Sequence, residues 1–145
     1  MPPRLPDQPA LPGHTLITTT DHLRAALLSA PRGSALFLPE GSVYNLGGAQ
    51  LEVTAANLTL TSTGAGALLD GEALSRIFYV TDATLALHHI HLRNGAGVTY
   101  GAGIFAESSV VLTLTSSTIT SCHASSSSGN AQGGAIYAST SVVLT

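Results

Sequence analysis

Apolar side chains alternate with small polar ones along most of this chain. The segments NLTLTST (57–63), TLALHHIHL (84–92) and VVLTLTSSTIT (110–120) place apolar residues at every second position, with Thr, Ser or His between them. This period of two, together with the many β-branched residues, predicts short half-buried strands. In the third segment the alternation breaks after Leu114 and resumes at Ile119. The break indicates a bend between two short strands rather than one long strand.

Two landmarks recur along the chain and indicate an internal repeat. Leu-x-Leu pairs begin at Leu36, Leu58, Leu85 and Leu112, and Leu144 begins a further one. An isoleucine followed by an aromatic residue recurs at Ile77, Ile104 and Ile136. In both series the spacing between successive landmarks is constant through the middle of the chain. In the last repeat this spacing is longer, by the same amount in both series. The shared change predicts an inserted loop in CHASSSSGNAQ (122–132), a polar run rich in turn residues.

A repeat of this length with two or three short strands is typical of one coil of a solenoid. A single coil cannot bury its apolar face, so successive coils stack and form ladders of like residues. The sequence therefore predicts an all-β fold, a single-stranded parallel β-helix of about four coils. A β-sandwich of hairpins is the alternative, but it would not require the two landmarks to share their spacings.

The N-terminal region differs from the repeats. Residues 1–17 contain several prolines and are predicted to form an extended arm, followed by the β-helix over 18–145. Residues 20–30 place Leu23 and Leu27 on one stripe and end before Pro31, which predicts a short helix with Thr20 or Asp21 as its N-cap. We expect this helix to cap the first coil, with coils from residue 34 onward and an incomplete last coil.

Composition excludes several classes of protein. Hydrophobic residues make up 44% of the chain and charged residues 9%, so a core can form. The five arginines are scattered, which argues against a nucleic-acid partner. No apolar run approaches the roughly 20 residues of a spanning helix, so no transmembrane segment is predicted. The first residues lack the apolar region of a signal peptide. Cys122 is the single cysteine, so an internal disulfide is excluded.

Acidic residues that would serve polysaccharide cleavage are sparse. Of the eight Asp and Glu residues, only Asp70 and Glu72 are close in sequence, with Arg76 four positions further on. Such chemistry needs clustered carboxylates, with a basic residue beside them. The Asp70-Gly71 pair is also typical of a turn between strands, and we favour that reading. The sequence therefore predicts no catalytic residues, with Asp70, Glu72 and Arg76 as the only candidates.

The segment HHIHLR offers a second candidate site. If Leu87, Ile90 and Leu92 point inward, then His88, His91 and Arg93 point outward and form a surface patch for a sugar or a partner. The residues one period later are Thr115 and Thr118, which are poor metal ligands, so no metal site and no cofactor are predicted. A threonine ladder over Thr59, Thr61, Thr113 and Thr115 suggests ice binding, but Ala86 and His88 interrupt it. Asn57-Leu58-Thr59 is a formal glycosylation sequon.

The repeats resemble those of right-handed parallel β-helix proteins. The tetrapeptide Gly133-Gly134-Ala135-Ile136, and more loosely residues 101–104, resemble the Gly-Gly-Ala-Ile signature of polymorphic outer membrane protein repeats. The chain lacks the Phe-x-x-Asn signature of that family. More generally, residues 18–145 resemble the pectate-lyase-like superfamily. The resemblance implies a right-handed helix, a secreted or cell-surface setting, and adhesion or carbohydrate contact.

Together these observations predict a function. We expect a non-enzymatic extracellular or cell-envelope repeat module that contacts glycans or surface proteins and is a fragment of a longer repeat protein. The alternative is a polysaccharide lyase or hydrolase of the pectate-lyase-like type. A third hypothesis is self-association by strand addition at residues 141–145, because SVVLT forms an apolar, uncharged edge.

Overall fold

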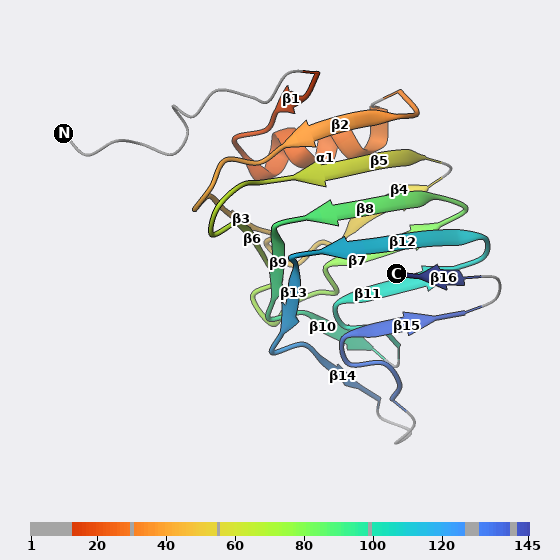
Figure 1. The fold of residues 1–145 in the computed structure, drawn as a ribbon. Helices are drawn as coiled ribbons and strands as arrows, with labels where there is room; N and C mark the ends of the chain where they lie inside the picture. Colours follow the sequence, from red (N-terminus) through yellow and green to blue (C-terminus); the bar gives the residue numbers. More distant parts are fainter. Residues whose placement is uncertain (1–12, 30, 55, 99, 127–130, 140–141) are drawn as a thin grey trace.

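The computed structural model describes residues 13–145 except 30, 55, 99, 127–130 and 140–141. Every pair of described strands is parallel, and the chain winds into a β-solenoid of about three turns with one short helix (Figure 1). Parallel pairing follows from the repeat, because each coil lays the same segments beside those of the previous coil in the same direction. The predicted all-β solenoid is confirmed, and hairpins of a sandwich are absent from the described part.

Three walls of stacked strands enclose the core. Wall A consists of β1 (Thr15–Leu16), β2 (Ser34–Phe37), β5 (Asn57–Thr61), β8 (Thr84–His88), β12 (Val110–Thr115) and β16 (Val142–Leu144). Wall B consists of β3 (Val43–Asn45), β6 (Ala67–Asp70), β9 (Ile90–Arg93) and β13 (Thr118–Thr120). Wall C consists of β4 (Leu51–Thr54), β7 (Phe78–Thr81), β11 (Ile104–Glu107) and β15 (Ile136–Ala138). The pair β10 (Ala96–Val98) and β14 (His123–Ser125) stands apart from the walls. Walls B and C each hold four strands, which span about three turns, whereas the sequence predicts about four coils.

The leucine ladder of wall A follows the sequence repeat through most of its length. Leu58, Leu85, Leu112 and Leu144 are register partners in successive strands. At the first coil the expectation was wrong, because Leu36 pairs with Leu60 rather than Leu58. A shift of two residues leaves Leu36 on the inner face, since side chains alternate with a period of two. The hydrophobic pattern alone therefore could not detect it.

The second landmark is out of register between two coils, which corrects the expected isoleucine–aromatic ladder. Ile104 pairs with Phe78, not with Ile77, whereas Ile104 and Ile136 are partners as expected. A shift of one residue exchanges the faces of a strand. Phe78 accordingly lies in the core, and its neighbour Tyr79 joins the outward aromatic row instead.

The inserted residues lie where the sequence predicts them. Ser125 still pairs with Val98, at the offset that relates Leu85 to Leu112 in the earlier coils. Gln132 bridges to Tyr100 at the longer offset that relates Ile104 to Ile136. The register therefore changes between Ser125 and Gln132, inside the predicted loop, and part of that interval lies outside the described residues. The strands on either side stay in phase because the loop absorbs the additional length.

In the last two coils, a single residue in the left-handed region makes the corner between walls A and B. His89, between β8 and β9, has φ 56°, and Ser116, between β12 and β13, has φ 49°. One residue of this conformation turns the chain sharply without an intervening loop, which confirms the predicted bend after Leu114. The left-handed conformation is unfavourable for residues with a Cβ, so these corners cost free energy.

Replacing Ser116 by glycine is expected to raise the free energy of unfolding by up to about 1 kcal/mol, because glycine adopts positive φ without steric penalty. Urea unfolding followed by circular dichroism measures the change. Thr120→Gly is the matched control, since Thr120 lies in strand β13 on the same wall. Glycine there is expected to lower stability by about 0.5–1 kcal/mol. Equal losses in both variants would contradict the left-handed corner.

The N-terminal cap consists of a helix and a strand. Helix α1 (Thr20–Ser29) packs against β4 and buries Leu23 and Leu27 in the core. Thr19 is the observed N-cap, because its hydroxyl accepts a hydrogen bond from the His22 amide at 3.0 Å, whereas the sequence predicts Thr20 or Asp21. The Arg24 guanidinium donates to the carbonyls of the loop before β4 and ties the helix to the first coil.

The edge of β2 is covered by β1 rather than by the helix. Thr15 and Leu16 pair with Leu36 and Phe37, and Ile17 is fully buried. Residues 15–17 fall within the range 1–17 that the sequence assigns to the arm, and they contact the first coil. Residues 1–12 lie outside the described part of the chain.

Candidate functional site

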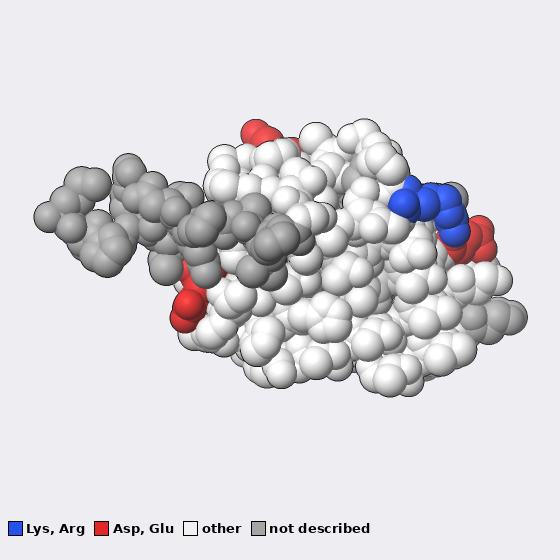
Figure 2. All heavy atoms as spheres, turned by 45° about the horizontal axis from the view of Figure 1, so that its top comes forward, with Lys and Arg blue, Asp and Glu red and all other residues white. Residues whose placement is uncertain are grey.

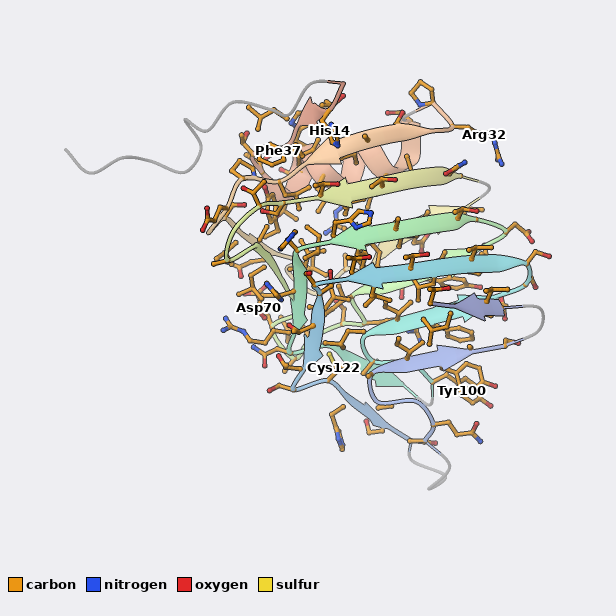
Figure 3. The ribbon with its side chains drawn as sticks, in the orientation of Figure 1. His14, Arg32, Phe37, Asp70, Tyr100 and Cys122 are labelled. Carbon is orange, nitrogen blue, oxygen red and sulfur yellow. The ribbon has the colours of Figure 1, made fainter. Side chains whose placement is uncertain are left out.

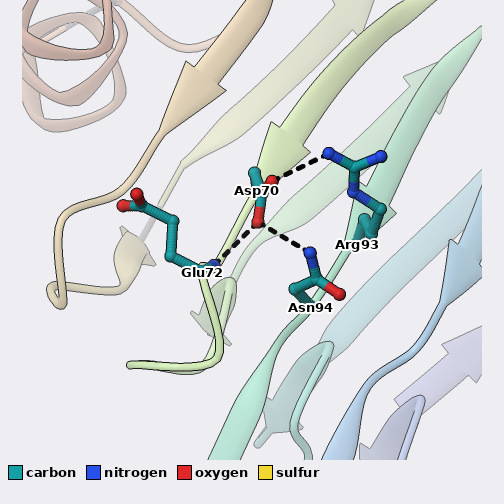
Figure 4. A network of polar contacts seen from close by, with 4 residues as sticks. All are labelled: Asp70, Glu72, Arg93 and Asn94. Atoms are coloured by element: carbon teal, nitrogen blue, oxygen red, sulfur yellow. Dashed lines mark hydrogen bonds and ion pairs between the residues drawn. The ribbon is translucent and has the colours of Figure 1, made fainter.

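Asp70, at the end of β6 in wall B, is the centre of a closed polar network (Figure 4). Its carboxylate accepts hydrogen bonds from the Glu72 amide at 2.7 Å, the Arg93 guanidinium at 3.0 Å and the Asn94 side-chain amide at 3.2 Å. Burial alone would raise the pKa of Asp70, but these donors together hold it below its usual value. Asp70 is thus an ionised structural group that links two coils.

Glu72 and Arg76, the other two catalytic candidates, also bind protein groups. A carboxylate oxygen of Glu72 accepts the Gly47 amide at 2.8 Å, one coil earlier. Arg76 donates to the carbonyls of Gly101 and Tyr100 at 2.7 and 2.8 Å, one coil later. The three side chains therefore reach in different directions and do not converge on a common point. Their positions fit the turn that the sequence favoured.

The histidine patch is divided between two walls. His88 ends β8 in wall A, while His91 and Arg93 lie on β9 in wall B, beyond the corner at His89. All three side chains are at least partly exposed, as predicted. His91 already contacts the Thr118 hydroxyl at 2.8 Å and the Ala65 carbonyl at 3.0 Å. Arg93 binds Asp70, so two of the three side chains have partners within the protein.

No group of three His, Cys, Asp or Glu side chains suited to a metal ion occurs among the described residues. The thiol of Cys122 is half-buried, and burial raises its pKa, so it stays protonated at neutral pH.

The strands of wall A are poor in ionisable side chains. None of its six described strands contains Asp, Glu, Lys or Arg. Figure 2 shows the molecule obliquely from the capped end, with charged side chains at the periphery and a broad uncharged area between them. Ala86 stands between Thr59 and Thr113, and His88 stands between Thr61 and Thr115. The threonine ladder is therefore interrupted in its middle strand, as the sequence indicates.

Wall C carries a row of aromatic side chains on its outer face. Tyr79, Phe105 and Tyr137 are register partners in three successive strands and are all partly exposed. The rings of Tyr79 and Phe105 stack at 5.4 Å with an interplanar angle of 7°, and Tyr137 meets Phe105 edge-on at 5.2 Å. Tyr100 packs against the ring of Tyr137 at 4.5 Å. We call these four residues the aromatic row. They are four of the seven Phe and Tyr residues of the chain.

Polar side chains flank the aromatic row. The Tyr79 hydroxyl donates to Glu107 at 2.6 Å, and this bond is the largest of the influences that raise the pKa of Tyr79. The guanidinium of Arg76 lies 4.9 Å from the centre of the Phe105 ring, within the range of a cation–π contact. Figure 3 shows Tyr100 on the opposite side of the solenoid from Asp70. The aromatic row and the Asp70 network are therefore separate features.

Two shallow grooves lie along β4, and one of them includes Tyr79 of the aromatic row. One, of about 240 Å³, is lined by Glu52, Thr54, Tyr79 and Thr81 on β4 and β7. The other, of about 150 Å³, lies between α1 and β4 and is lined by Arg24, Leu28, Gln50 and Glu52. Both are smaller than the roughly 300–1,000 Å³ of a typical small-molecule pocket. Each therefore suits a single ring or a short chain segment rather than an enclosed cofactor.

Sequence reasoning missed the aromatic row as a surface feature. The landmark of an isoleucine followed by an aromatic contained two of its members, Phe105 and Tyr137, but it assigned Phe78 in place of Tyr79. The alternation of FYVT (78–81) offered a signal, since aromatics at adjacent positions must lie on opposite faces of a strand. The one-residue shift between coils concealed which of them lies outside.

The outermost strand of wall A bears on the hypothesis of self-association through 141–145. β16 pairs with β12 on one side, and Val143 and Leu144 are 56% and 52% exposed. Residue 141 lies outside the described part. Self-association through this strand stays a prediction. The one described helix is too short and polar to cross a membrane.

Comparisons with known proteins identified no relative of this chain. No family model matches the chain, and neither the curated proteins nor the solved structures gave a significant match. The chain is thus placed among parallel β-solenoids by its own structure. The narrower resemblance to polymorphic outer membrane protein repeats or pectate-lyase-like proteins rests on the sequence motifs alone.

Proposed function

We propose that this chain is a non-enzymatic β-helix module of the extracellular or cell-envelope setting that binds glycans through the outer face of wall C. The single observation that carries the proposal is the aromatic row, which presents partly exposed rings along three adjacent coils. The setting rests on the resemblance to secreted and surface β-helix proteins.

Aromatic rings suit sugars, because the C–H groups on the apolar face of a sugar ring are attracted to the electron-rich π system of an aromatic ring. The row runs across the strands, so its rings follow one another along the solenoid at the strand spacing of about 4.8 Å. Tyr79 and Phe105 stack face to face, so an extended oligosaccharide laid along this row would contact their outer edges together with the differently oriented rings of Tyr137 and Tyr100. The hydroxyl and carboxylate groups beside the row supply partners for sugar hydroxyls.

An enzymatic role gains no support from the three candidate residues. The carboxylates of Asp70 and Glu72 accept main-chain amides, and Arg76 donates to main-chain carbonyls. Each has a structural partner in a neighbouring coil or turn. Binding without cleavage is therefore the function that these contacts favour.

Replacing Tyr100 by alanine is expected to weaken glycan binding by about fivefold, which corresponds to the loss of one aromatic contact of about 1 kcal/mol. The measurement is titration calorimetry with oligosaccharides that the wild-type protein selects from a glycan array. Thr59→Ala on wall A is the matched control and should bind like the wild type. The proposal fails if no oligosaccharide binds, or if Tyr100→Ala binds as tightly as the wild type.

A further inference from the structure

The polar groups around the two grooves differ in how many hydrogen-bonding sites remain open to a ligand. Glu52 lines both grooves, and among the described residues its carboxylate accepts one hydrogen bond, from Gln50 at 3.1 Å. An ionised carboxylate has about four acceptor sites. Most of the acceptor capacity of Glu52 is therefore open to a ligand in either groove.

The nearby cations, in contrast, are bound to the protein. Arg24 donates to the carbonyls of Leu46, Ala49 and Gln50 at 2.9–3.2 Å. Each of the three guanidinium nitrogens of Arg76 donates a hydrogen bond, to Gly101, Tyr100 and the Gln50 side chain. Each arginine thus already donates three hydrogen bonds to the protein, out of the five N–H groups of a guanidinium. An anionic ligand would find charge here, but only the remaining N–H groups as donors.

A second carboxylate adds to the excess of open hydrogen-bond acceptors over open donors. Glu107 accepts the Tyr79 hydroxyl, and Tyr79 lines the larger groove. Thr54 and Thr81 supply hydroxyl groups in the same groove, which donate or accept as required. The face of wall C is therefore rich in acceptors and in carboxylate charge, beside rings that favour sugar faces and cations.

From this imbalance we infer that the glycan bound by wall C is an amino sugar polymer with free ammonium groups and no carboxylates. An ammonium group donates three hydrogen bonds and matches the open acceptors of Glu52. A uronate would place its carboxylate near Glu52 and Glu107, where like charges repel. The inference rests on the proposed function and specifies the class of glycan that the same site takes.

The test compares three oligosaccharides of equal length by titration calorimetry at pH 6, where glucosamine units carry ammonium groups. We expect the glucosamine oligomer to bind more tightly than the neutral glucose oligomer, and the galacturonate oligomer to bind most weakly. Glu52→Gln should weaken binding of the glucosamine oligomer by about tenfold, the loss of one hydrogen bond to a charged group, and leave the glucose oligomer within about twofold.

Asp21→Asn is the control, because it removes the same charge from α1 at a residue that lines neither groove. It should leave all three affinities within about twofold. Tighter binding of galacturonate, or equal effects of Glu52→Gln and Asp21→Asn, would overturn the amino sugar assignment while glycan binding itself stands. Absence of binding to all three oligomers and to a wider array would overturn the proposed function as well.

Discussion

Leu85→Ala is expected to lower the free energy of unfolding by about 2–5 kcal/mol, as observed for buried leucines that leave a cavity. Leu85 is fully buried in β8 and lies between Leu58 and Leu112 in the ladder of wall A. The coils above and below hold the strand in place, so the cavity cannot collapse easily. Urea unfolding measures the loss. Because small domains have a total stability of about 5–15 kcal/mol, the variant would unfold at a much lower denaturant concentration.

Leu144→Ala is the matched control for this prediction. Leu144 occupies the next position of the same ladder but is 52% exposed in β16, so its truncation should cost less than about 1 kcal/mol. The two variants compare identical chemistry at the interior and at the outermost strand of wall A. Equal losses would contradict the exposure of Leu144 and would show that something covers it in solution.

Asp70→Asn is expected to lower the free energy of unfolding by about 2 kcal/mol at neutral pH. The amide keeps the shape of the side chain, but it loses the charge that binds Arg93 and weakens the bonds from Glu72 and Asn94. The value lies below that of a fully buried ion pair because Arg93 is about half exposed and can be hydrated. Asp82→Asn, at an exposed corner, should change stability by less than about 0.5 kcal/mol.

The same prediction has a defined pH dependence. The pKa of Asp70 is lower in the folded protein, so its contribution is fully present above the unfolded pKa of about 3.9. That contribution disappears as the pH falls through the native pKa. The stability difference between the wild type and Asp70→Asn should therefore be constant near neutral pH and shrink below about pH 4. A difference that persists unchanged to acid would contradict an ionised Asp70.

Much of the fold could be predicted from the pattern of the sequence. Alternation identified the strands, and the spacing of Leu58, Leu85 and Leu112 gave the register of three coils correctly. The lengthened last repeat located the insertion, because a solenoid tolerates additional residues only where they leave the stacked strands in phase. The apolar stripe of Leu23 and Leu27 likewise identified the capping helix. Each of these features depends on local periodicity, which the sequence displays directly.

The errors of the sequence-based prediction concern register and the N-terminal contacts, which local periodicity does not determine. A two-residue shift at Leu36 and a one-residue shift at Phe78 arise from how much chain each corner consumes, and that depends on backbone conformations at corners such as His89 and Ser116. Positive φ is enriched at Asn, Asp and His, but it also occurs here at Ser116, a residue type that does not indicate it. The N-cap at Thr19 and the strand β1 were missed for a similar reason, since both depend on which neighbour the chain meets in space.

The sequence by itself determined a stack of short strands and a helical cap. Only the tertiary structure decided what the polar and aromatic side chains do. It brought Tyr79, Phe105 and Tyr137 into one outer row, although a full coil of chain separates each from the next. It also directed Asp70 and Arg76 to partners in other coils. Contacts between coils depend on register, and a single residue of shift exchanges the two faces of a strand, so the surface is fixed only when the coils have stacked.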